Sequence, residues 1–131
     1  MLALAFGLLC AAVVIGAGLA ILFVKRPVAT PPPGTIPRTI ARAIPVAHAA
    51  LGAASLVALT LALRRGQPAT GMGTAGFGPI ALGLLALTLA LGLVLALTAW
   101  RRHRPAAMLV GAHASLAVAA FVVLLTLVAL G

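Results

Sequence analysis

Four apolar runs follow one another along this 131-residue chain and are separated by basic clusters. Apolar runs of about 20 residues can cross a lipid bilayer as helices. Ala and Leu dominate all four runs, and both residues favour helix. The sequence therefore predicts an all-α membrane protein, a bundle of four transmembrane helices in a single domain over residues 1–131. The expected spans run from about Met1 to Val24, Thr39 to Leu63, Phe77 to Trp100 and Ala106 to Leu130.

The chain contains nine Lys and Arg residues but no Asp or Glu. A soluble domain carries roughly 25% charged residues of both signs, whereas this chain carries 7%. The missing carboxylates exclude a carboxylate general acid or base, an EF-hand and a Ser-His-Asp triad. The single cysteine, Cys10, excludes an internal disulfide. No phosphate-binding loop or nucleic-acid module is present, so we expect no nucleic-acid partner.

The basic residues predict the orientation in the membrane, because cytoplasmic loops carry an excess of Lys and Arg. The loops between spans one and two and between spans three and four share one side, which we expect to be cytoplasmic. Both termini would then lie outside, in a bacterial inner membrane. The first span lacks a basic n-region and is too long for a signal peptide, so we expect it in the mature protein. The cytoplasmic set is Lys25, Arg26, Arg38, Arg42, Arg101, Arg102 and Arg104, against Arg64 and Arg65 on the other side.

The two halves of the chain resemble each other. An Ala-His-Ala sequence around His48 recurs around His113 at an offset of 65 residues. The first and third spans match at an offset of 76 residues, which pairs Gly16 with Gly92. Because each half holds two spans, both halves insert with the same orientation. The sequence thus predicts two tandem parallel two-helix repeats, residues 1–65 and 77–131, joined by a linker over 66–76; chance similarity in an Ala/Leu-rich background is the alternative.

His48 and His113 lie inside spans at equivalent places. Polar side chains within a membrane are costly and usually functional. Under the repeat symmetry, both imidazoles can point at the bundle axis from opposite sides. Two neutral imidazoles without a carboxylate suit axial ligation of an iron porphyrin, whereas tetrahedral zinc needs more ligands. We therefore expect one haem b held by both histidines; the alternative is that each bonds a backbone carbonyl or a Ser of a neighbouring helix.

Small and basic residues complete the predicted cofactor site. Gly16 and Gly92 lie at about the depth of the histidines and can provide notches for the flat ring. Gly52, one turn after His48, also leaves room. Arg42 and Arg104 are the cations best placed to neutralise the propionates. The alternative for the glycines is ordinary helix packing, in which small residues are common.

The spans that carry these histidines and glycines resemble the small four-helix membrane cytochromes b and the haem-carrying membrane subunits of respiratory enzymes. The resemblance covers nearly the whole chain except its loops. It implies one-electron transfer, linking a quinone pool to a partner redox protein. The two membrane histidines suffice for one bis-histidine haem.

Two other functions stay open at this stage. One is a structural accessory subunit, without a cofactor, of a larger respiratory or photosynthetic membrane complex. The other is a pigment-binding subunit in which a histidine ligates the magnesium of a chlorophyll or bacteriochlorophyll. A channel or carrier is disfavoured because the spans hold few polar groups. In every case we expect the lipid bilayer as a partner, together with other membrane subunits or further copies of this chain.

Overall fold

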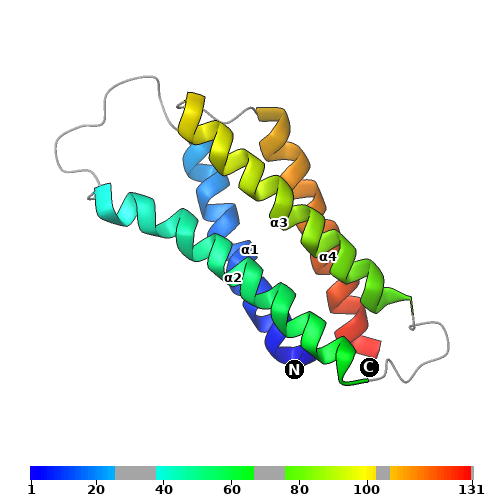
Figure 1. Cartoon of the computed structure of the whole chain (residues 1–131). Helices are drawn as coiled ribbons and strands as arrows, with labels where there is room; N and C mark the ends of the chain where they lie inside the picture. The colour runs from blue at the N-terminus through cyan, green and yellow to red at the C-terminus, as the bar shows by residue number, and fades with distance from the viewer. Residues whose placement is uncertain (26–37, 67–75, 103–106, 131) are drawn as a thin grey trace.

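The computed structural model describes residues 1–25, 38–66, 76–102 and 107–130. These residues form four helices and no strand, and consecutive helices run antiparallel (Figure 1). The prediction of an all-α bundle of four helices is therefore confirmed. The helices are α1 (Leu2–Lys25), α2 (Arg38–Arg64), α3 (Phe77–Arg102) and α4 (Ala107–Leu130).

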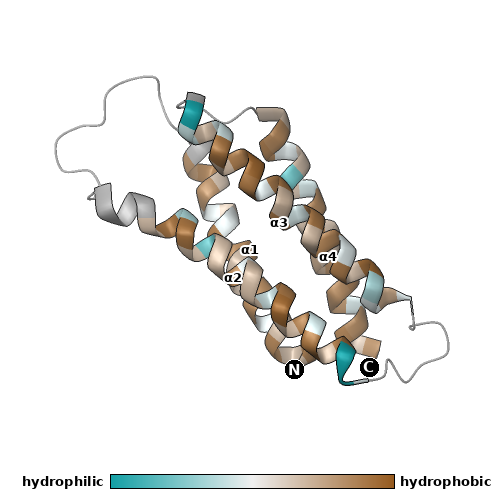
Figure 2. Cartoon of the chain, viewed as in Figure 1, coloured by the Kyte–Doolittle hydropathy of each residue, from teal (hydrophilic) through white to brown (hydrophobic). Residues whose placement is uncertain are grey.

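All four helices are long and apolar enough to cross a membrane. Apolar residues cover most of the coloured part of each helix, and the most hydrophilic residues lie near helix ends (Figure 2). Only 17% to 22% of each span is buried inside the bundle, and many large apolar side chains are exposed on its surface. Val14 and Val46, for example, are 72% and 68% exposed. Such a surface is suited to lipid and not to water, and the chain is an integral membrane protein.

A glycine in the left-handed conformation ends α2 at its carboxyl terminus. Gly66 has φ 62°, a left-handed conformation that costs glycine little because it has no Cβ. Its N–H donates to the Leu63 carbonyl at 3.2 Å, which satisfies one of the carbonyls left free at a helix terminus. Near its other end, α2 contains Pro45, whose missing N–H removes one helical hydrogen bond. The membrane-spanning part of α2 begins close by, at Ala43.

The helices pack as two hairpins that meet side by side. α1 packs chiefly against α2, and α3 packs chiefly against α4. Less extensive packing joins α2 to α3 and α1 to α4. Each helix thus has two neighbours, and α2 and α4 face each other across the diagonal of the bundle. Side chains carried on α2 and α4 can therefore meet only near the bundle axis.

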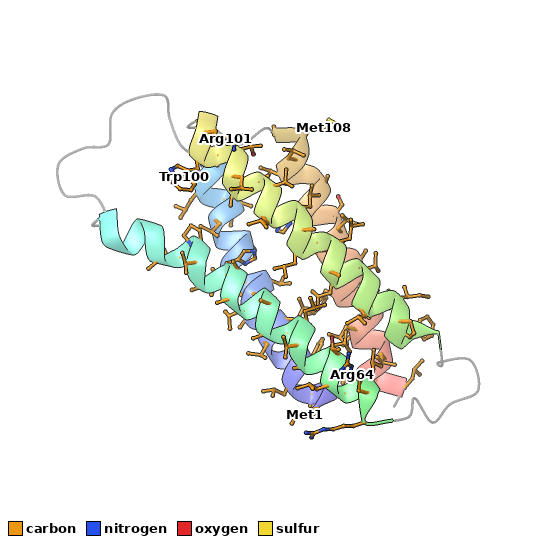
Figure 3. The ribbon with its side chains drawn as sticks, viewed as in Figure 1. Met1, Arg64, Trp100, Arg101 and Met108 are labelled. Atoms are coloured by element: carbon orange, nitrogen blue, oxygen red, sulfur yellow. The ribbon has the colours of Figure 1, made fainter. Side chains whose placement is uncertain are left out.

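The buried core lies at one end of the bundle. This closed end carries Met1 and Arg64, whereas Trp100, Arg101 and Met108 lie at the other end (Figure 3). Two interactions join elements there that are distant in sequence: the Phe6 and Phe121 rings stack at 5.5 Å, and the Ser55 hydroxyl donates to the Ala5 carbonyl at 2.8 Å. The core cluster consists of Ala5, Leu9, Ala58, Leu59, Ala81, Leu85, Leu124 and Leu127.

Equivalent positions of the two halves are buried in the bundle. At the offset of 76 residues, buried positions of α1 coincide with buried positions of α3, and at the offset of 65, positions of α2 coincide with those of α4. Both hairpins therefore contribute the same helix faces to the bundle interior. The coincident pairs are Ala5 with Ala81, Leu9 with Leu85, Ala12 with Thr88, Ser55 with Ala120, Leu59 with Leu124 and Ala62 with Leu127.

Candidate cofactor site between two histidines

The structure brings together the two histidines that the sequence pairs. His48 comes from α2 and His113 from α4, the two helices on the diagonal. Their ring centres lie 6.0 Å apart, and the ring planes meet at 76°. Both side chains are partly buried. The imidazoles therefore face each other inside the bundle, and neither is turned out to lipid.

Each imidazole is held by a backbone carbonyl of the neighbouring helix in its own hairpin. Nδ1 of His48 lies 2.9 Å from the carbonyl oxygen of Ala12, and Nδ1 of His113 lies 3.0 Å from that of Thr88. A carbonyl oxygen can only accept, so each Nδ1 carries the hydrogen and donates it. In a neutral imidazole the lone pair is then on Nε2. Both rings are in the tautomer that can bind a metal through Nε2, with the other nitrogen oriented by a hydrogen bond.

A glycine makes room for each imidazole. A Cβ added at Gly16 would lie 2.8 Å from Cε1 and 3.3 Å from Nδ1 of His48. A Cβ added at Gly92 would lie 2.9 Å from Cε1 and 3.4 Å from Nδ1 of His113. A contact under 3.0 Å is far inside van der Waals distance. The space that each glycine leaves is therefore taken by a histidine ring, whereas the sequence assigned that space to a flat cofactor.

The two halves of the site are built alike. The acceptor carbonyls belong to residues 76 positions apart, Ala12 and Thr88, and each residue lies four positions before its glycine. The sequence offers a backbone carbonyl of a neighbouring helix only as the alternative partner of each histidine, and the structure contains this hydrogen bond for both. A backbone carbonyl leaves no signal in the sequence, and the offset of 76 residues gives the second acceptor only once the first is known.

The structure shows no close contact between the histidines and the other predicted site residues that it describes. Gly52 lies one turn after His48, and a Cβ added there would lie 3.7 Å from Cδ1 of Leu89 in α3, an ordinary contact. Gly52 is thus not required by close packing. Arg42 belongs to the first turns of α2, but its side chain lies outside the described part of the structure. Arg104 also lies outside the described residues.

The chemistry of the donor set fits a metal that takes two imidazole ligands. A metal bound about 2 Å from one nitrogen of each ring places the ring centres about 6 Å apart, close to the separation in this structure. Among the described residues, no group of three or more His, Cys, Asp or Glu side chains could hold a metal ion. Two nitrogen ligands leave a tetrahedral site incomplete, but they complete the axial set of an iron porphyrin.

The core cluster lies on one side of the two histidines. In α2 the core cluster begins at Ala58, ten positions after His48, and in α4 it begins at Leu124, eleven positions after His113. Within the described segments, the cluster has no member on the basic side of the histidines. Packing within this cluster ties the two hairpins together at the end that carries Met1 and Arg64.

Comparison of this chain with models of known protein families, with curated proteins and with solved structures finds no match.

Proposed function

We propose that this chain is an integral membrane subunit that binds one haem b and transfers electrons. The observation that supports this most directly is the pair of neutral imidazoles, His48 and His113, whose centres are 6.0 Å apart. Their Nδ1 atoms are engaged by carbonyls, so both Nε2 lone pairs are available to one iron. A haem bound there supplies reversible one-electron chemistry.

The chain's own residues determine how such a cofactor is held. His48 and His113 orient their Nε2 atoms, and the apolar helices keep water from the site. The hydrogen bonds from Nδ1 end on neutral carbonyls and not on carboxylates, since the chain has no Asp or Glu. The ligands are therefore neutral imidazoles in a neutral to cationic environment. Such an environment favours the reduced, less positive state of the iron and raises its potential.

We further propose that the chain arose as two tandem two-helix repeats. The support comes from the offsets: the same pair of offsets relates the histidines, their glycines, their carbonyl acceptors and the buried core positions. The repeats have parallel orientation in the membrane, so a pseudo-twofold axis along the membrane normal would pass between the two imidazoles. Each half would supply one histidine ligand to a shared cofactor.

The excess of basic residues supports an orientation with the side of Lys25 and Arg101 in the cytoplasm and both termini outside. A bacterial inner membrane is the location we propose. The electron donor and acceptor would be other redox centres. We propose a quinone pool as one of them and a membrane-bound redox protein as the other, within a complex of respiratory type.

The same geometry favours haem binding over two alternatives. A chlorophyll magnesium takes one axial histidine per pigment, and two facing rings 6.0 Å apart leave room for one shared metal and not for two macrocycles. A purely structural subunit has no need for two matched intramembrane histidines, each in the same tautomer. Both observations favour one bis-histidine cofactor.

The test is the visible spectrum of the full chain purified in detergent from a haem-replete bacterial host. We expect a Soret band, sharp α and β bands on reduction, and one haem per chain. A far-red absorption band would instead indicate a chlorin. A colourless preparation of correctly folded protein, obtained from a host that also assembles a control cytochrome b, would contradict the proposal and leave the accessory role.

A further inference from the structure

We infer that Gly16 and Gly92 are positioning residues that set the tautomer and the orientation of the two histidines. Only the expected effect on haem binding rests on the proposed function; the expected effect on the histidine tautomers does not. We call the Ala12 carbonyl with Gly16 the first seat, which holds His48, and the Thr88 carbonyl with Gly92 the second seat, which holds His113. Each seat combines a hydrogen-bond acceptor with a gap where a side chain would otherwise stand.

The contacts show that the seats serve the imidazoles and not helix packing. The three atoms nearest to a Cβ at Gly16 all belong to the His48 ring, and the three nearest to a Cβ at Gly92 all belong to the His113 ring. A packing glycine would instead meet the backbone or an aliphatic side chain of the next helix. Gly18, two positions after Gly16, has nothing within 4 Å of its added Cβ.

An alanine in place of Gly16 or Gly92 would displace the imidazole ring that the glycine contacts. In each seat the Cβ of an alanine would come closest to Cε1 and next closest to Nδ1, the two atoms beside the hydrogen bond. The imidazole stands at the end of a flexible side chain, so it can turn away at little cost to the fold. Turning away lengthens the bond from Nδ1 to the carbonyl beyond hydrogen-bonding range. The hydrogen is then free to move to Nε2, the nitrogen that must bind a metal.

The two seats also fix the angle between the rings. Each carbonyl and each glycine belong to a rigid helix, and together they confine one ring edge from two directions. The angle of 76° between the imidazole planes is thus set by the register of α1 against α2 and of α3 against α4. One methyl group added in either seat alters the orientation of one ring and leaves the other ring in place.

The experiment compares Gly16→Ala and Gly92→Ala with Gly18→Ala and Gly83→Ala, which add a methyl group to the same helices at positions with nothing within 4 Å. Histidine 15N spectra of the cofactor-free full chain report the tautomer of each ring. We expect protonated Nδ1 for both rings in the wild type and in both controls. We expect loss of that state for His48 alone in Gly16→Ala and for His113 alone in Gly92→Ala.

The haem-loaded proteins provide the second measurement. We expect the low-spin spectrum to be lost or strongly reduced in both seat variants and to persist in both controls. Unchanged tautomers in Gly16→Ala and Gly92→Ala would overturn the inference, whatever the chain binds. If the wild type has the expected tautomers but takes up no haem, the seats stand and the proposed function fails, so the two failures are distinguishable.

Discussion

The imidazole planes of His48 and His113 lie at 76° to each other, with ring centres 6.0 Å apart. When two axial imidazoles on one iron are nearly perpendicular, their π-interactions fall on different iron orbitals, which stay close in energy. When the planes are parallel, one orbital is singled out. The angle between these two rings is therefore visible in the magnetic properties of a haem held between them.

The first prediction concerns that angle. Ferric low-spin haem in the wild-type chain should give an electron paramagnetic resonance spectrum with one large g value and weak, broad remaining features, because the ring planes are close to perpendicular. Frozen membranes containing the full chain are the sample. A well-resolved rhombic spectrum with three g values would indicate nearly parallel rings and would contradict the geometry described here.

The second prediction concerns the core that holds the hairpins together. Leu59 and Leu124 are both fully buried and lie at equivalent positions of the two halves. Replacing either by alanine should destabilise the protein by about 2 kcal/mol, because the lost methyl groups leave a cavity. The equivalent exposed pair, Val57 and Val122 at 58% and 52% exposure, provides matched controls.

Reversible unfolding in mixed detergent micelles measures these changes in the free energy of unfolding. We expect similar losses for Leu59→Ala and Leu124→Ala, and losses near zero for Val57→Ala and Val122→Ala. A large effect at one leucine and none at the other would show that the two halves do not contribute equally to the core.

The third prediction concerns the buried hydrogen bond from the Ser55 hydroxyl to the Ala5 carbonyl at 2.8 Å. Hydrogen bonds between transmembrane helices contribute about 0.6 kcal/mol on average. Ser55→Ala should therefore lower the free energy of unfolding by that small amount, since the equivalent position of the second half, Ala120, is itself a buried alanine. A loss several times larger would show that Ser55 has a further role, such as a contact with a bound group.

The fourth prediction concerns orientation. In a Cys10→Ala background, a cysteine at Gln67 should react with a membrane-impermeant thiol reagent added to intact cells, because the proposed topology places the side of Arg64 and Arg65 outside. A cysteine at His103 should react only after the membrane is opened. The reverse pattern would place the termini in the cytoplasm and contradict the proposed topology.

Much of the fold could be predicted because the sequence offers few alternatives. Four apolar runs of transmembrane length, in a chain without carboxylates, leave a helical membrane bundle as the consistent reading. The histidines could be paired because histidine is rare here, so a match at a fixed offset stands out. Gly16 and Gly92 could be paired by the same reasoning, since the offset of 76 residues that relates the first and third spans also relates these two glycines.

The details of the site could not be predicted from the residues alone. The acceptors at Ala12 and Thr88 are backbone carbonyls, and a carbonyl has no side-chain signature in a sequence. The depth of Gly16 and Gly92 could be estimated from the helical rise, but not which neighbouring group they face. That depends on the rotation and register of each helix against the next, which the packing of the whole bundle decides.

The most direct test of the shared ligation of one haem by His48 and His113 is the low-spin haem signal of His48→Ala and His113→Ala beside the wild type. Each variant lacks one of the two imidazoles that face each other at 6.0 Å, so both should lose the six-coordinate low-spin spectrum. External imidazole, small enough to fill the space left by the ring, should restore it. A low-spin spectrum identical to that of the wild type in both variants would show that the iron is held elsewhere, and the account of this site would be wrong.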